Sequence, residues 1–134
     1  MRYVALIDGK PGAYGVMFPD LPGCAAMGKT IDDAMRHAGD ALRDWAEVTE
    51  EGGGKVPAGR SADRIRQDRD VREALRGGAQ LASVPLVHST GKPVKANLSI
   101  DAGVLAALDD EATRRKLTRS ALVELLAREM LVRV

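Results

Sequence analysis

The sequence predicts an α+β protein made of two units, and three features of the chain support this. Two strand-like runs, residues 2–7 and 13–18, come before an amphipathic helix. The last part of the chain has the order strand, helix, helix within about forty residues. A short stretch of turn-forming residues separates the two parts. The predicted boundaries are 1–88 for the first unit, 89–93 for the linker and 94–134 for the second unit.

The first unit opens with a β-hairpin and a helix. The runs RYVALI and AYGVMF flank DGKPGA, whose Gly, Pro and Asp residues favour a turn. Residues 24–28 predict a short third strand. Thr30 then begins a helix as its N-cap, with Asp33 in the place of the usual Glu or Gln of a capping box. The apolar residues of this helix, which ends near Glu47, repeat at spacings of three and four and are Ile31, Met35, Ala38, Leu42 and Trp45.

A polar middle segment joins this helix to a fourth strand. Residues 49–60 are rich in Gly and predict a flexible connection. Ser61 then begins a helix over 61–76, in which arginines are interleaved with acidic residues. This pattern favours a solvated helix with ion pairs one turn apart over an RNA-binding helix. Residues 79–87 follow as a strand, and because proline has no N–H to donate, this strand is at a sheet edge or ends at Pro85.

The second unit opens with a strand whose residues alternate in character. Successive side chains of an extended chain point to opposite faces, so residues 94–100 have one apolar and one polar face. The apolar face needs a core to cover it. The apolar residues are Val94, Ala96, Leu98 and Ile100, and the polar ones are Lys95, Asn97 and Ser99.

Two capped helices complete this unit. With one strand and two helices, the unit is too small to fold alone. Asp101 is the N-cap of a helix over about 102–115, and Thr118 is the N-cap of the last helix. A unit of about forty residues with one strand buries too little surface and leaves both strand edges unpaired. Two copies solve both problems when their strands pair antiparallel and their four helices cover the apolar face. We therefore expect an obligate homodimer through residues 94–134, with a tetramer as a further expectation through the N-terminal sheet.

The polar face of such a paired ribbon has the chemistry to read DNA. A two-stranded antiparallel ribbon fits the major groove. Lys95 can donate to guanine, Asn97 can bond adenine with two hydrogen bonds, and Ser99 accepts either base. Free N–H groups at the start of the last helix suit a DNA phosphate. We therefore expect Thr118, Arg119 and Ser120 to bind the phosphate backbone of the DNA. A two-fold protein of this kind is expected to prefer a palindromic operator.

Composition and cysteine usage argue against several other classes of protein. The single cysteine, Cys24, excludes an internal disulfide and fits a reducing cytoplasm, where it serves as a small buried hydrophobe. No apolar run approaches the roughly 20 residues of a membrane span, so we expect no membrane contact. His37 and His88 are far apart, and we expect no metal and no cofactor.

We expect no catalytic residue in the first unit. Asp8, Asp20, Asp32 and Asp33 are the candidates we considered for a carboxylate cluster that holds Mg²⁺. Asp8 is predicted in the hairpin turn, Asp20 in a Pro-rich loop, and the other two at a helix N-terminus, where each has a structural role. Ser61 and Ser120 have no base nearby in the sequence that would activate them.

The segment KANLSIDAGVLAALDDEATRRKLTRSALVELLAREM resembles the ribbon-helix-helix DNA-binding fold. By this resemblance Lys95, Asn97 and Ser99 fall on the base-reading positions, and Thr118, Arg119 and Ser120 on the phosphate-binding ones. One position departs from the pattern, because Lys116 stands where Gly or Asn is usual. A left-handed backbone at a lysine costs on the order of 1 kcal/mol.

The N-terminal half resembles HicB-type antitoxins. The elements YGV, FPDLPGC and GKT occur in the order typical of that family, and both resemblances together cover nearly the whole chain outside 49–78. They imply a partial, catalytically inactive ribonuclease-H-like domain that binds a small HicA-like toxin, an mRNA-cleaving ribonuclease. The C-terminal dimer would bind the operator of its own operon and repress it.

Two alternatives and one unknown remain at this point. The chain could be a ribbon-helix-helix transcriptional regulator whose N-terminal domain senses a ligand or mediates assembly. It could also be an interaction module whose C-terminal dimer serves assembly alone. The toxin-binding residues are unknown, with the loop 19–24, the strand edges and the helix 61–76 as candidates that also have ordinary structural explanations.

Overall fold

The chain forms two compact units, residues 1–88 and the residues after them. We describe a computed structural model in which residues 1–88 and 91–132 are placed, and each unit is treated by itself.

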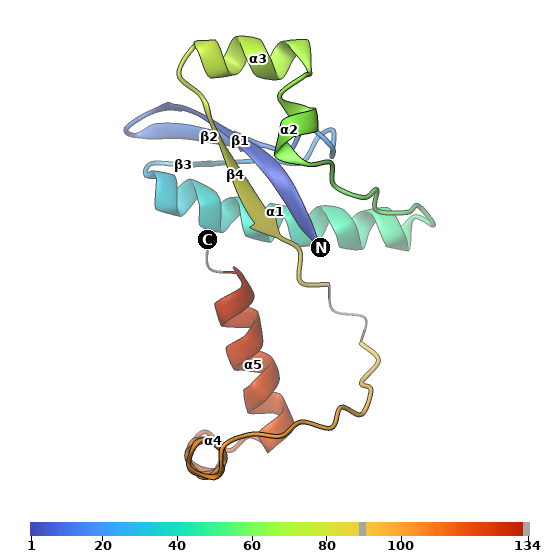
Figure 1. Cartoon of the computed structure of the whole chain (residues 1–134), viewed down its shortest axis with the longest axis vertical. Coiled ribbons are helices and arrows are strands. Elements are labelled where there is room, and N and C mark those ends of the chain that lie inside the picture. Colours follow the sequence, from blue (N-terminus) through green and yellow to red (C-terminus); the bar gives the residue numbers. More distant parts are fainter. Residues whose placement is uncertain (89–90, 133–134) are drawn as a thin grey trace. The chain divides into compact units, whose positions relative to one another are not determined.

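The first unit is built on a four-stranded antiparallel sheet (Figure 1). The strand order is β3-β2-β1-β4, so β3 and β4 form the two edges, as Pro85 predicted for β4. The register pairs Leu6 with Met17 and Leu81, and Gly15 with Met27. The strands are β1 (Arg2–Lys10), β2 (Ala13–Met17), β3 (Ala25–Gly28) and β4 (Gln80–Pro85).

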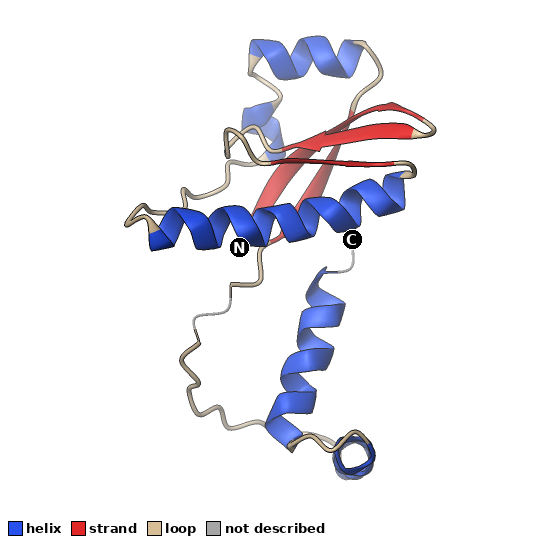
Figure 2. Cartoon of the chain, turned by 180° about the vertical axis from the view of Figure 1, so that it is seen from behind, coloured by secondary structure: helices blue, strands red, loops and turns tan. Residues whose placement is uncertain are grey.

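Helices cover both faces of this sheet (Figure 2). The long helix α1 (Ile31–Glu51) packs on one face, against the alternate residues Tyr3, Ala5 and Ile7 of β1. The short helices α2 (Ala62–Ile65) and α3 (Arg69–Arg76) pack on the other face, against Val4 and Leu6. Strand β1 is therefore buried on both sides, which explains why its sequence is a nearly continuous apolar run rather than an alternating one.

The predicted polar helix over 61–76 is wrong as a single element, because the chain breaks between α2 and α3. The buried residues Ile65 and Val71 both contact the sheet core. In one continuous helix a separation of six residues would turn them about 120° apart around the axis. The break at Arg66–Asp68 allows both side chains to face the sheet.

The connection before α2 is packed rather than free along its second half. Helix α1 runs to Glu51, beyond the predicted end near Glu47. Val56 packs against the α1-side core, and the Tyr3 hydroxyl donates to the carbonyl of Pro57 at 2.6 Å. These contacts lead the chain closely past β1 toward α2.

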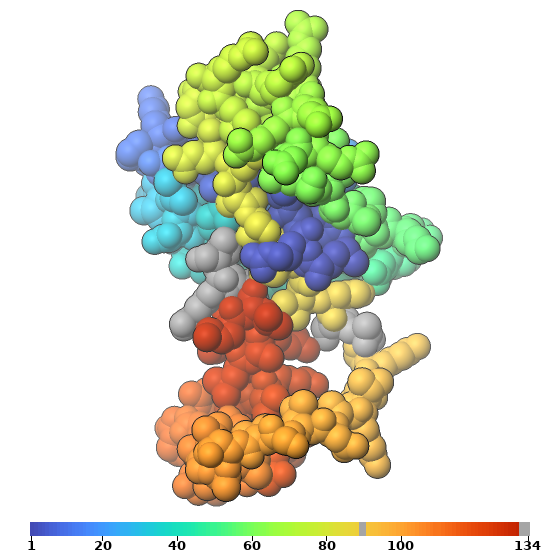
Figure 3. Space-filling view, in the orientation of Figure 1, coloured from blue at the N-terminus to red at the C-terminus, as the bar shows by residue number. Residues whose placement is uncertain are grey.

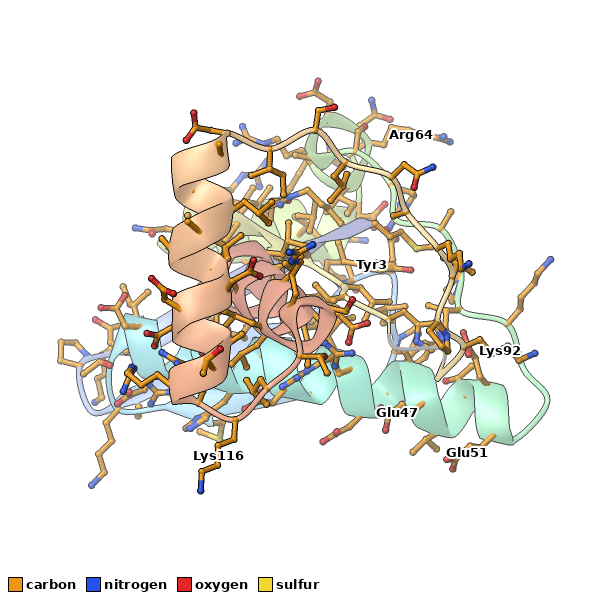
Figure 4. The ribbon with its side chains drawn as sticks, turned by 90° about the horizontal axis from the view of Figure 1, so that it is seen from below. Tyr3, Glu47, Glu51, Arg64, Lys92 and Lys116 are labelled. Atoms are coloured by element: carbon orange, nitrogen blue, oxygen red, sulfur yellow. The ribbon has the colours of Figure 1, made fainter. Side chains whose placement is uncertain are left out.

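The second unit contains two helices joined by a tight turn. They are α4 (Ala102–Arg114) and α5 (Arg119–Val132). Asp101 caps α4 as predicted, accepting from the Val104 N–H at 3.1 Å. Lys116 has a left-handed backbone with φ 57°, while the Leu117 N–H donates to Ala112 O at 2.8 Å. This is a Schellman ending with lysine in the position that glycine favours, and Figure 4 shows the lysine side chain projecting into solvent.

Candidate functional site

The segment 94–100 is extended but forms no strand in the single chain, unlike the sequence prediction. The reason is that a strand needs a hydrogen-bonded neighbour, and within one copy this segment has none among the described residues. Its apolar side chains are strongly exposed, with Val94 at 88% and Leu98 at 69%. The start of the segment projects from the rest of its unit in the space-filling view (Figure 3).

The apolar face of this segment borders an open hollow of about 620 Å³, here called the ribbon hollow. Its apolar lining comes from alternate residues of the segment together with one residue of each helix: Val94, Ala96, Leu98, Ile100, Leu105 and Val123. The predicted alternation therefore holds for the apolar face. Lys95 and Asn97 are exposed and lie outside the lining, whereas Ser99, predicted on the same polar face, is itself part of the lining.

The predicted phosphate-binding residues gather at the start of α5. Thr118 caps this helix, because its side-chain oxygen accepts from the Ala121 N–H at 3.1 Å. Arg119 and Ser120 both line the ribbon hollow. The Arg119 guanidinium donates two hydrogen bonds of 2.8 Å to the Asp109 carboxylate of α4. This last contact links the two helices and was not predicted.

In the first unit a network of charges fixes the loop between β2 and β3. The Asp20 carboxylate accepts from both the backbone N–H and the Nε of Arg60, each at 2.6 Å. The same guanidinium donates two further bonds, of 3.0 and 2.8 Å, to Asp68 at the start of α3. The pKa of Asp68 is lowered by these bonds. Arg60 thus joins the loop to the helices on the second face of the sheet.

The rest of the FPDLPGC loop has equally clear structural roles. Phe18, Leu21 and Cys24 are buried in the α1-side core. The Trp45 indole donates to the Pro22 carbonyl at 3.3 Å, and Gly23 adopts a positive φ of 85°. These contacts account for most of the motif by packing, and within the motif Pro22 and Gly23 are the exposed residues.

The sequence model of the HicB-like antitoxins of bacterial toxin–antitoxin systems matches residues 3–127. The chain belongs to this family. The match spans both units, which agrees with the resemblance that the N-terminal motifs indicated.

Several solved structures of antitoxins resemble this HicB-like antitoxin, two of them over nearly its whole length. The crystal structure of the Burkholderia pseudomallei antitoxin HicB is 30% identical, with 98% of this chain and 96% of that chain covered and a TM-score of 0.59. The crystal structure of the antitoxin HicB3 is 26% identical, covers all of both chains and has a TM-score of 0.56. A chain of the HicA3 and HicB3 toxin–antitoxin complex is 25% identical over 65% of this chain and 99% of that chain, with a TM-score of 0.55.

A phage protein is also related to the HicB-like antitoxin. It is a 14.9 kDa protein encoded in the rep-hol intergenic region of Haemophilus phage HP1. The two chains are 27% identical over 109 residues, which is 81% of this chain and 80% of the phage protein.

The HicB-like family is one of antitoxins and not of enzymes, which confirms the prediction that this chain is not an enzyme. The carboxylates considered for Mg²⁺ do not gather: over residues 1–88 and 91–132, no three His, Cys, Asp or Glu side chains are placed to hold a metal. Asp8 lies in β1 opposite Gly15 rather than in the predicted turn. Asp32 and Asp33 lie in the first turn of α1, where Asp33 forms an ion pair with Arg36.

The histidines and the cysteine, the other side chains with chemistry of interest, also have structural contacts or are buried. His37 contacts the Met27 carbonyl at 2.7 Å, and His88 contacts Glu50 at 2.7 Å. Burial raises the pKa of the Cys24 thiol to about 11, so the thiol is protonated at neutral pH and unreactive. Within the described part of the chain, no helix has the length and apolar character needed to span a bilayer.

Replacing Asp20 by Ala tests the role of the charge network. We expect the free energy of unfolding to fall by about 1–3 kcal/mol, because the N–H and guanidinium of Arg60 lose a largely buried acceptor. Urea unfolding followed by tryptophan fluorescence measures it, with Asp63→Ala, a carboxylate of α2 with no ion pair to a described residue, as control. Equal stabilities of both variants would show that the network does not hold the loop.

Sequence reasoning missed this network because it has no local pattern. Asp20 and Arg60 are 40 residues apart, and each lies in a segment whose composition is typical of loops. Only the folded sheet brings the two segments together.

Proposed function

We propose that this HicB-like antitoxin neutralises a HicA-like, mRNA-cleaving toxin by direct binding and represses its own operon by binding operator DNA. The similarity to a chain of the HicA3 and HicB3 toxin–antitoxin complex is the observation that carries the first part. That similarity covers 65% of this chain, and a B. pseudomallei HicB structure limited to the N-terminal domain covers the same share with 26% identity. This share corresponds in length to the unit of residues 1–88.

Neutralisation is best explained by exclusion of RNA from the toxin. We assign residues 1–88 to a partial ribonuclease-H-like domain, which its antiparallel sheet with helices on both faces supports. Its acidic residues have structural partners or lie apart, which argues against metal-dependent cleavage of RNA by the domain itself. Occupying the toxin's active surface is then the simplest way for it to act, in the cytoplasm where mRNA is available.

The exposed apolar surface of the second unit supports dimerisation through it. We propose that residues 94–100 of a second copy pair antiparallel with the same segment and close the ribbon hollow. The support is the exposed apolar face of the segment, together with Val104 and Leu126 exposed on the two helices. Contiguous apolar surface of this kind indicates an interaction site, and the self-complementary pattern favours a second copy.

The paired ribbon would present Lys95, Asn97 and Ser99 to the major groove as a ribbon-helix-helix domain does. The exposure of Lys95 and Asn97 supports this, while Ser99 lies nearer the hollow. Thr118, Arg119 and Ser120 at the start of α5 would hold the DNA backbone. The two-fold symmetry predicts a palindromic operator.

Purification of the tagged full chain from its native host, followed by mass spectrometry, tests the antitoxin function. We expect a stoichiometric small basic protein, encoded next to this gene, that is toxic when expressed alone and harmless with this chain. The untagged host carried through the same purification is the control. If the chain purifies alone and still binds the DNA upstream of its gene, the regulator with a ligand-sensing or assembly domain replaces the antitoxin proposal.

A further inference from the structure

The ion pair between Arg119 and Asp109 lies where the proposed DNA backbone contact is made. The two hydrogen bonds join Nε and Nη2 of the guanidinium to the two carboxylate oxygens, which is a bidentate arrangement. Both side chains are partly exposed, Arg119 at 57% and Asp109 at 43%. The Asp109 carboxylate therefore lies beside the Arg119 guanidinium at the surface of the unit.

Both partners stay ionised at neutral pH. The hydrogen bonds lower the pKa of Asp109 and raise the pKa of Arg119, each by stabilising the charged form. The pair consequently has a net charge near zero at the one arginine assigned to a phosphate. A DNA phosphate that approaches Arg119 meets the negative charge of Asp109 at the same place.

We propose that Asp109 weakens DNA binding by neutralising Arg119, so that the ion pair sets the affinity of this protein for DNA. This inference rests on the DNA-binding function proposed above. Exposed ion pairs contribute little to stability, so the pair opens or is shared at small cost when a phosphate competes for the guanidinium. The effect would be independent of base sequence, because the backbone carries the same charge everywhere.

A purely orienting role for Asp109 is the competing explanation, and one substitution separates the two. Asn at position 109 keeps an oxygen that accepts from the guanidinium but removes the negative charge. If the charge matters, Asp109→Asn binds DNA more tightly; if Asp109 serves to hold Arg119 in position, binding is unchanged or weaker. Asp110→Asn is a matched control, because Asp110 is exposed on the same helix and has no ion pair among the described residues.

The experiment measures binding of full-length wild type, Asp109→Asn and Asp110→Asn to two duplexes at several salt concentrations. One duplex comes from the region upstream of this gene, and the other is a scrambled duplex of equal length and composition. We expect Asp109→Asn to bind both about three- to tenfold more tightly near physiological salt. The slope of log K against log salt should steepen by about 0.9 for each arginine released, or about 1.8 for a dimer. Asp110→Asn should show a clearly smaller gain and less steepening.

The outcomes separate this inference from the function on which it rests. Equal affinities of the two variants, or weaker binding by Asp109→Asn with an intact dimer in sedimentation, would overturn the attenuating role while leaving DNA binding established. Absence of DNA binding by the wild type would overturn the proposed repressor function, and the inference with it. As a further check, Arg119→Ala combined with Asp109→Asn should abolish the gain.

Discussion

Replacing Leu42 by Ala is expected to weaken toxin neutralisation by destabilising the first unit. Leu42 is fully buried in α1, in the core between this helix and the sheet. Truncating a buried leucine lowers the free energy of unfolding by about 2–5 kcal/mol, because it removes apolar contacts and leaves a cavity. That is a large part of the roughly 5–15 kcal/mol that stabilises a typical domain. Urea unfolding followed by the fluorescence of Trp45, the single tryptophan, measures the change, and survival of cells that express the toxin reports its consequence.

Val48→Ala is the matched control for this prediction. Val48 lies on the same helix but is 69% exposed, so its truncation should change the free energy of unfolding by less than about 0.5 kcal/mol. Because the chain forms two units, Leu42→Ala should retain DNA binding. An unaltered unfolding midpoint would mean that Leu42 is not in a packed core, whereas lost DNA binding would mean that the units depend on each other.

Replacing Asn97 by Ala is expected to remove specific DNA binding while leaving toxin neutralisation intact. An asparagine that bonds adenine with two hydrogen bonds contributes about 1–3 kcal/mol of discrimination, and a two-fold dimer makes this contact twice. Fluorescence anisotropy with the upstream duplex should show the loss. Binding to a scrambled duplex should be nearly unchanged, because phosphate contacts do not depend on base sequence.

Thr113→Ala serves as the control, since Thr113 is another exposed polar residue of the second unit and lies in α4. It should bind the upstream duplex as the wild type does. If Asn97→Ala retains full affinity and sequence preference as an intact dimer, the polar face of residues 94–100 does not read bases, and the second unit serves assembly alone.

Local sequence signals determined most of the secondary structure and the family. The apolar run 2–7, the strand-like run 13–18, the capping residues Thr30 and Asp101, and the apolar repeat of α1 are signals that each act over a few residues. Such short-range preferences can be recognised in the sequence without knowledge of the tertiary structure. The loop motif FPDLPGC indicated the family for a similar reason. Its residues have fixed packing roles, and their order can be read directly from the sequence.

Only the tertiary structure decided the features that join distant segments. The break between α2 and α3 follows from the need of Ile65 and Val71 to face one sheet, and the Arg60 network needs loop and helix side by side. The Arg119–Asp109 pair likewise depends on the angle between α4 and α5. Residues 94–100 show the opposite case: their alternation is plain in the sequence, yet they form no strand in one copy because the hydrogen bonds of a strand come from a neighbour. Sequence patterns therefore determined the polar and apolar faces of the elements, and the tertiary structure decided which side chains contact one another across them.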